Sequence, residues 1–330
     1  MKIVFYPIPS LKNRYYLLLK KVAYDRGYEI IEPKSLSWFL KNKNGVDVVH
    51  INWLSRIKKN FFKSFFFLSV LFLLNIYGKK IIWTEHNIHP HESKRKLGSK
   101  LFNFLLMLIC SKIVIQDYKR FKKLKDKRKY CYIHHPTFES IFHVIPDTKT
   151  QIQGNKISFL YFGYIRKYKG IDLLIDIASK FRDSDFMVIG DPSFFWKKEK
   201  EKRNLLHSIR KAAKRNNFSA LLKYVPDSEI PEILTGYDIL VLPYHKFHIS
   251  GMLMLSFTFN LPCVIKSNSF SDFFAEKGMA ITFNTKEELS TIIKNITKQD
   301  IAILKNNIMT QKHLFSFSSF KEIQQSIYET

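Results

Sequence analysis

The stretch ISFLYFGYIRKYKGIDLLIDIASKF, residues 157–181, decides the fold class. Its first six residues are mostly apolar, as in a strand buried on both faces, and Gly163 ends the run. Gly170 then opens a second segment, IDLLIDIASKF, in which the apolar residues recur with helical spacing. A buried strand followed directly by such a helix is typical of a parallel α/β sheet.

The same alternation continues on both sides of this stretch. Strands are predicted at 2–7, 46–53, 79–87, 111–116, 185–192, 238–244 and 262–267, with helices between them that include 13–27, 60–77, 96–110, 197–216 and 251–260. The polar segment 146–155 is the best candidate for a linker. The 330 residues are too many for one ordinary core. We therefore expect two Rossmann-like, doubly wound domains that face a cleft, residues 1–150 and 151–330.

The charge of the chain is strongly positive and uneven. Lys and Arg number 54 against 28 acidic residues. Residues 1–150 hold 29 basic and 10 acidic groups, and residues 151–330 hold 25 and 18. Such an excess favours anionic partners: nucleic acid, anionic lipid or phosphorylated ligands. Three scattered cysteines indicate reduced thiols in the cytoplasm, and MKIVFYPIPS reads as a first strand, not as a signal peptide.

The turn FGYIRKYKG (162–170) has the composition of a phosphate-binding loop. A glycine at the end of a strand lets a ligand approach the backbone closely. Arg166 offers a fork of donors to phosphate oxygens, and Lys169 offers a compact charge. A solvated basic loop would read the same way, so this turn alone leaves both interpretations open.

Further motifs resemble a known family. The turn, MVIGDP (187–192) and DILVLPY (238–244) resemble the donor-binding half of GT-B glycosyltransferases, in particular the retaining family 4 enzymes that build bacterial surface polysaccharides. VDVVHINW (46–53) and KKIIWTEHNIHPHE (79–92) resemble acceptor-domain strands of its capsule and exopolysaccharide branch. The resemblance implies a last helix, about 312–330, that packs back on the first domain. It also implies that Arg166 and Lys169 stabilise a diphosphate leaving group, and that the donor contacts Gly163, Gly190, Pro226, His248, Ser250, Gly251 and Ser256.

The segment HKFHISGMLMLS (245–256) departs from the family pattern. Where relatives carry two glutamates separated by seven residues, this chain has His248 and Ser256. Ser250 and Gly251 still open a helix, whose N-terminus suits a diphosphate, although an ordinary serine cap is an equally simple interpretation. The missing carboxylates also leave open a catalytically inactive relative.

The segment TEHNIHPHE (84–92) concentrates histidines after a strand. The resemblance implies that His86 faces the transferred sugar and acts in catalysis, with Asn13, Glu85 and Asn87 on the acceptor side. A histidine that only caps a loop is the simpler alternative. Regular metal-ligand spacing is absent and no cysteine is near, so we expect no metal site and no cofactor beyond the sugar donor.

The segment FFKSFFFLSVLFLLNIY (61–77) is the most apolar in the chain. It is too short to cross a bilayer, which takes about 20 residues. It is either a buried helix or one that lies in a membrane interface, and its cationic flanks favour the second. KRFKKLKDKRK (119–129) adds eight cations in eleven residues, although that segment taken alone is better explained as a solvated basic helix.

The combined expectation is a metal-independent glycosyltransferase. It would move a sugar from a nucleoside-diphosphate sugar to a lipid-linked glycan precursor in capsule, exopolysaccharide or O-antigen synthesis. It would work in the cytoplasm, peripherally bound to an anionic membrane surface. A nucleic-acid-binding protein is the rival that charge suggests, but no recognised module appears and the aromatics do not alternate with the cations. A Rossmann oxidoreductase is disfavoured because GxGxxG is missing.

Overall fold

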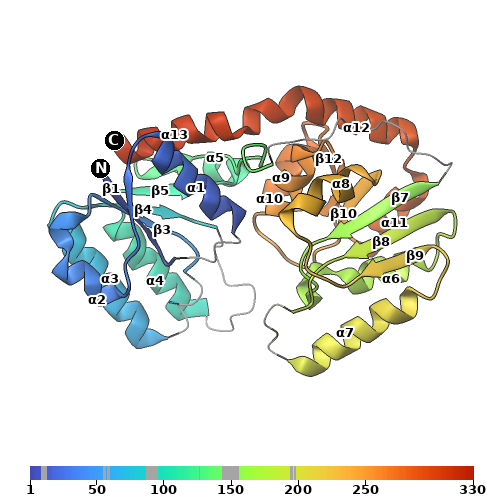
Figure 1. Cartoon of the computed structure of the whole chain (residues 1–330), viewed down its shortest axis with the longest axis horizontal. Coiled ribbons are helices and arrows are strands. Elements are labelled where there is room, and N and C mark those ends of the chain that lie inside the picture. The colour runs from blue at the N-terminus through green and yellow to red at the C-terminus, as the bar shows by residue number, and fades with distance from the viewer. Residues whose placement is uncertain are drawn as a thin grey trace. The chain divides into compact units, whose positions relative to one another are not determined.

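The computed structural model describes residues 1–8, 13–54, 57, 60–86, 96–125, 127–142, 156–193, 196 and 198–330. The chain forms two compact units: unit 1 is Met1–Pro136 with Phe317–Thr330, and unit 2 is Thr137–Ser316. Each unit holds one six-stranded sheet whose paired strands are parallel (Figure 1). The expected pair of parallel α/β sheets is confirmed.

The sheet of unit 1 has the strand order β2-β1-β3-β4-β5-β6. Its strands are β1 (Lys2–Tyr6), β2 (Glu29–Ile31), β3 (Val48–Ile51), β4 (Lys80–Thr84), β5 (Lys112–Ile115) and β6 (Tyr130–Tyr132). Its helices are α1 (Arg14–Asp25), α2 (Leu36–Lys41), α3 (Phe61–Ile76), α4 (Lys96–Ile109), α5 (Tyr118–Lys122) and α13 (Phe317–Glu329), with the 3-10 turn η1 (Lys43–Gly45). A shared core joins α2, α3 and α4 to one face of the sheet, and α1 and α13 lie on the other (Figure 1).

The sheet of unit 2 has the order β12-β11-β10-β7-β8-β9. Its strands are β7 (Ile157–Phe162), β8 (Ser184–Ile189), β9 (Phe218–Leu221), β10 (Ile239–Leu242), β11 (Cys263–Lys266) and β12 (Ala280–Phe283). Its helices are α6 (Ile171–Ala178), α7 (Glu199–Ala212), α8 (Ile230–Thr235), α9 (Gly251–Thr258), α10 (Ser269–Ala275), α11 (Lys286–Asn295) and α12 (Lys298–Gln311), with η2 (Lys167–Lys169), η3 (Asp227–Glu229) and η4 (Lys312–Phe315).

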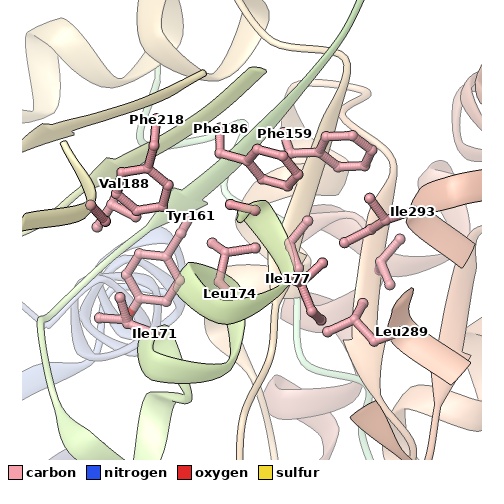
Figure 2. Close-up of a cluster of buried hydrophobic side chains, with 14 of the residues drawn as sticks. Phe159, Tyr161, Ile171, Leu174, Ile177, Phe186, Val188, Phe218, Leu289 and Ile293 are labelled. Atoms are coloured by element: carbon pink, nitrogen blue, oxygen red, sulfur yellow. The ribbon is translucent and has the colours of Figure 1, made fainter. Parts of the chain in front are cut away.

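The core of unit 2 explains why the opening stretch folds as expected. Figure 2 shows strand residues such as Phe159 and Phe186 packed against Leu174 and Ile177 of α6 and Leu289 of α11. The rings of Phe159 and Phe186 stack with their centroids 5.1 Å apart. Because β7 and β8 are covered in this way, their apolar runs are buried and the turns at their ends are held firmly.

The last helix packs on unit 1, as the resemblance implied. Tyr28 donates a hydrogen bond to Glu329 at 2.6 Å, and Arg26 pairs with the same carboxylate at 2.9 Å. In the interior, Tyr328 lies 2.7 Å from Nδ1 of His50 on β3. The helix begins at Phe317 and not near residue 312, because Lys312–Phe315 form the separate turn η4, which belongs to unit 2.

Several short elements were not expected from the sequence. They include β2, β6 and α2, each of three to six residues, whereas α5 lies at the start of the basic segment for which a solvated helix was one interpretation. Helix α3 occupies the apolar segment at 61–76. In the described part of the chain, no helix combines the length and apolar character needed to cross a bilayer.

Candidate active site

The strand order of unit 2 reverses between β7 and β10, which pair in the middle of the sheet. In parallel α/β sheets, ligands bind beyond the carboxyl ends of the two strands at such a switch point. The loop after β7 is the glycine- and cation-rich turn, Gly163 to Gly170. The loop after β10 runs from Pro243 to Ser250. The fold therefore brings the turn after β7 and the loop after β10 to the edge of the sheet where a ligand is expected.

Gly170 allows these two loops to pack against each other. Its backbone is left-handed, with φ 70°, and a β-carbon there would lie 1.7 Å from the carbonyl oxygen of Pro243. The backbone N–H of His245 also donates to the carbonyl of Tyr168 at 2.9 Å. The loop after β10 thus holds the turn in place. This favours a ligand-binding loop over a basic loop that only faces solvent.

Gly163 and Gly190 shape the start of the turn. Gly163 has φ 133°, a conformation that favours glycine, and its N–H donates to Ile189 at 3.0 Å. A β-carbon on Gly190 would lie 1.9 Å from the carbonyl oxygen of Gly163, so Gly190 lets the ends of β7 and β8 meet. Pro226 lies beyond β9, where it begins η3. The donor contacts expected of these three residues stay predictions.

Lys169 is a half-buried cation enclosed by aromatic rings. Its Nζ lies 3.9 Å from the ring centroid of Tyr244 and 5.3 Å from that of Tyr168. Among the residues that the structure describes, no carboxylate pairs with this ammonium group. Burial lowers the pKa of Lys169 to about 7. Binding of an anion beside Lys169 would stabilise its charged form and would therefore be favourable.

Arg166 lies at the start of η2 and is also half-buried. Its guanidinium carbon is 5.3 Å from the ring centroid of Trp196, which is itself buried. Stacking on an indole restricts the orientation of the guanidinium group. Neither aromatic partner, Trp196 or Tyr244, was singled out from the sequence.

The loop after β10 ends at the N-terminus of α9. Ser250 is buried and its Oγ accepts a hydrogen bond from Leu253 N–H at 3.3 Å, so it caps the helix. Gly251 is the first residue of α9. The side chain of Asn268 donates to the carbonyl of His248 at 3.1 Å and so ties the loop to α10. Asn268 is a positioning residue that the sequence did not reveal.

Ser256 is placed differently from the expectation. It is fully buried, and its hydroxyl donates to the carbonyl of Leu253 at 2.8 Å within α9. The side chain thus presents no accessible atom to a ligand in this structure. The expected donor contact of Ser256 has no support from its placement.

In unit 1, His86 lies just after β4, and its side chain contacts two residues that follow β3 and one residue of α1. Its Nε2 is 2.8 Å from Oδ1 of the buried Asn52. Its ring stacks on Trp53, with centroids 4.7 Å apart and planes at 3°, and meets the ring of Tyr15 edge-on at 4.9 Å. Because the amide oxygen only accepts, Nε2 carries the proton in this geometry, which leaves Nδ1 as the acceptor nitrogen.

Trp53 has a strained backbone. Its φ is 35°, a conformation uncommon for a bulky residue, and it lies directly after Asn52 at the end of β3. Strain of this kind is retained where surrounding structure enforces it, often at ligand sites. The sequence pointed to His86 but missed Asn52, Trp53 and Tyr15.

The three residues expected on the acceptor side have different outcomes. Asn13 caps α1, accepting the N–H of Tyr16 at 3.2 Å. Glu85 is buried in an ion pair with Arg120 at 2.8 Å, so both have structural partners. Asn87 lies outside the described residues. Acceptor roles for all three stay predictions.

Metal ligation gains no support from the described residues, where no group of three or more His, Cys, Asp or Glu side chains could hold an ion. The sequence has an Asp-x-Asp at Asp183 and Asp185, but these flank the amino end of β8, the sheet edge opposite the turn.

Two buried histidines of unit 1 are held neutral, since burial lowers the pKa of His50 to about 3 and that of His135 to about 4.

Comparison with known proteins identifies the class. A family profile described as glycosyl transferases group 1 matches residues 147–311, which is half of the chain, and the protein belongs to this family. Two records of a GDP-mannose:glycolipid 4-beta-D-mannosyltransferase of Xanthomonas campestris pv. campestris are each 23% identical over 254 residues. The match covers 72% of this chain and 66% of the relative, just under two thirds of its length.

Solved structures agree on the fold. The Anabaena protein Alr3699/HepE in complex with UDP-glucose superposes with a TM-score of 0.76 at 14% identity, over 100% of both chains. Sucrose-phosphate synthase from Thermosynechococcus elongatus gives 0.77 at 11% identity, over 100% of this chain and 98% of that one. These likenesses show that the chain has the GT-B fold.

Proposed function

We propose that this protein transfers a sugar from a nucleoside-diphosphate sugar to a lipid-linked glycan precursor. The observation that carries the proposal is the turn after β7, which presents Arg166 and Lys169 at the switch point of the unit that the family profile matches. Lys169 is enclosed by rings with no anion of its own among the described residues. A diphosphate supplies what this site lacks.

Each of the two cations has a distinct task in the proposed reaction. As the bond between sugar and diphosphate breaks, negative charge accumulates on the leaving phosphate. Arg166 binds two phosphate oxygens through its fork, and Lys169 neutralises the developing charge. Because that charge is greater in the transition state than in the bound donor, the cations raise turnover and not only affinity. They thereby do the work of a divalent metal, and we propose that none is required.

Further residues have proposed roles within each unit. The first N–H groups of α9, at Gly251, favour a negative group, and His248 is proposed to hydrogen-bond the donor. His86 is proposed to act on the transferred sugar through Nδ1, with Asn52 fixing its tautomer and Trp53 its ring plane.

The relatives support the proposed class of acceptor, and the cellular setting is part of the proposal. The curated relatives are named as acting on a glycolipid, which supports a lipid-linked acceptor here. We place the reaction in capsule, exopolysaccharide or O-antigen synthesis at the cytoplasmic face of the membrane. Retention of configuration follows only from the resemblance to the retaining family.

A transfer assay tests this function. Purified protein is incubated with radiolabelled GDP-mannose or UDP-glucose, a bacterial lipid extract and a chelator, and label in the organic phase is counted. We expect transfer by the wild type and a loss of about ten- to a hundredfold in Arg166→Ala. Binding of the donor without transfer to any acceptor or water would favour an inactive relative, which His248 and Ser256 make the second candidate. Absence of both binding and transfer would overturn the proposal.

A further inference from the structure

Helices α3 and α4 of unit 1 carry a cluster of exposed apolar side chains. More than half of the exposed large hydrophobic side chains that the structure describes lie on these two helices and the residue after α3. The largest are phenylalanines, and Phe61 and Phe62 are 75% and 80% exposed. A cluster of exposed apolar side chains on neighbouring helices indicates an interaction site.

The two helices present this surface as one unit. Phe67 of α3 stacks on Phe102 of α4 beneath it, with ring centroids 6.2 Å apart and planes at 15°. The side chain of Asn75 in α3 donates to the carbonyl of Ile109 in α4 at 3.0 Å. With their inner faces joined, the outer faces form what we call the α3–α4 surface: Phe62, Phe65, Phe66 and Phe72 of α3, and Leu101 and Phe104 of α4.

Polar groups within α3 are already satisfied. Ser64 donates to the carbonyl of Ile57 at 3.0 Å, and Ser69 donates to that of Phe65 at 3.1 Å. Asn75 is paired as described. Removing the α3–α4 surface from water therefore leaves no hydroxyl or amide of α3 without a partner, which keeps the cost of desolvation low.

The charged residues of α3 and α4 themselves are all lysines. Lys63 on α3 and Lys100 on α4 are exposed, and the sequence holds no acidic residue from Val48 to Thr84. Lys43 lies 3.8 Å from the ring centroid of Tyr77, at the end of α3. An apolar face bordered by cations complements the acyl chains and anionic headgroups of a membrane leaflet.

We propose that the α3–α4 surface inserts into one leaflet of an anionic lipid bilayer, with Lys63 and Lys100 at the headgroups. At 16 residues, α3 is about 24 Å long, shorter than the apolar core of a bilayer, so it lies in the interface and does not cross it. A second copy of the chain is a poorer occupant. Symmetric pairing of two helices that carry lysines and no acidic residue would bring like charges together.

The structure also revises which cations reach the membrane. In the basic segment 119–129, Arg120 is paired with Glu85 and Lys129 donates to the carbonyl of Leu108 at 2.9 Å, at the end of α4. These two cations serve the fold. Arg120 and Lys129 are therefore a poorer source of membrane selectivity than the exposed Lys63 and Lys100.

Vesicle flotation of the full chain tests the proposal. Vesicles of phosphatidylcholine alone, or with about 30% phosphatidylglycerol, are compared at low and high salt. We expect binding to the anionic vesicles, reduced but not abolished by salt, because the apolar contribution is not screened. Phe62→Ser with Phe65→Ser should weaken it at least tenfold. Lys63→Gln with Lys100→Gln should also weaken it and reduce its dependence on lipid charge.

A matched control uses two exposed apolar residues of α12 in unit 2. Ile303→Ser with Met309→Ser should leave flotation unchanged. Equal flotation of the wild type and the Phe62→Ser, Phe65→Ser variant would overturn the proposal, and so would absence of binding to either vesicle. A dimer in lipid-free sedimentation that the same variant dissociates, without vesicle binding, would assign the surface to a second copy. No nucleotide sugar or acceptor is needed, so failure here is distinct from failure of the proposed function.

Discussion

Raising the pH from about 6 to about 8 should weaken binding of a nucleoside-diphosphate sugar, because Lys169 must carry a proton to pair with a phosphate oxygen. Burial between Tyr168 and Tyr244 lowers its pKa to about 7 in the free protein. A bound diphosphate favours the charged form and raises that pKa. Binding above the free-state pKa therefore requires uptake of a proton, and affinity is lost as the pH rises through about 7.

The size of the effect follows from the charged fraction. With a pKa of about 7, the ammonium form makes up about 90% of Lys169 at pH 6 and about 10% at pH 8. The dissociation constant should accordingly rise about tenfold over this range. Each phosphate of a nucleoside-diphosphate sugar has one ester and one anhydride bond and no group that titrates near neutrality, so the ligand itself contributes no change.

Titration calorimetry measures both the affinity and the proton. Repeating the titration at pH 8 in two buffers with different ionisation enthalpies gives the number of protons taken up, which should be close to one. Lys169→Arg keeps its charge throughout this range, so it should bind with a flat profile. His248→Gln should retain the slope. A flat profile in the wild type, or a slope that persists in Lys169→Arg and vanishes in His248→Gln, would refute the reasoning.

Three further predictions follow from the geometry. Gly170→Ala should lower the melting temperature, with a loss of roughly 2 kcal/mol or more in the free energy of unfolding, because its β-carbon would meet Pro243 at φ 70°; an unchanged melting curve would show that the loops adjust freely. His86→Ala should lower turnover about 100-fold with donor affinity nearly unchanged. Asn52→Ala should lower turnover about tenfold and shift the pH profile of turnover. A loss of donor affinity as large as the loss of turnover would indicate a structural role for these residues. Arg166→Lys should lower turnover about tenfold with normal circular dichroism, because a point charge cannot replace the fork; wild-type kinetics would mean that Arg166 does not contact the diphosphate.

The fold was predictable because its strands are short, apolar and separated by amphipathic helices. The segment 157–181 shows this most clearly, since a buried strand, a glycine turn and a helix follow one another without ambiguity. The short edge strands β2 and β6 were missed because they are half-buried or exposed and only three residues long. Such segments take their conformation from pairing with a neighbour and not from their own pattern.

The site was predictable only where a motif is continuous in sequence. Arg166 and Lys169 lie in one turn, but their aromatic partners Trp196 and Tyr244 are brought there by the sheet. Asn52 reaches His86 across 34 residues of sequence for the same reason. The burial of Ser256 follows from the packing of α9, whose residues from 253 to 258 are all buried. Spacing indicates which residues can share a face, whereas the packed neighbours decide which atoms stay accessible.

The central claim is that the turn after β7 holds the diphosphate of a sugar donor. The most direct test is the dissociation constant of a nucleoside-diphosphate sugar for the double variant Arg166→Ala, Lys169→Ala, measured by calorimetry at pH 6. A double variant of two exposed cations in the same unit, Lys180→Ala, Arg182→Ala, is the matched control. We predict a loss of affinity on the order of 100-fold in the first and wild-type affinity in the second. Equal affinity in the wild type and both variants would contradict the account.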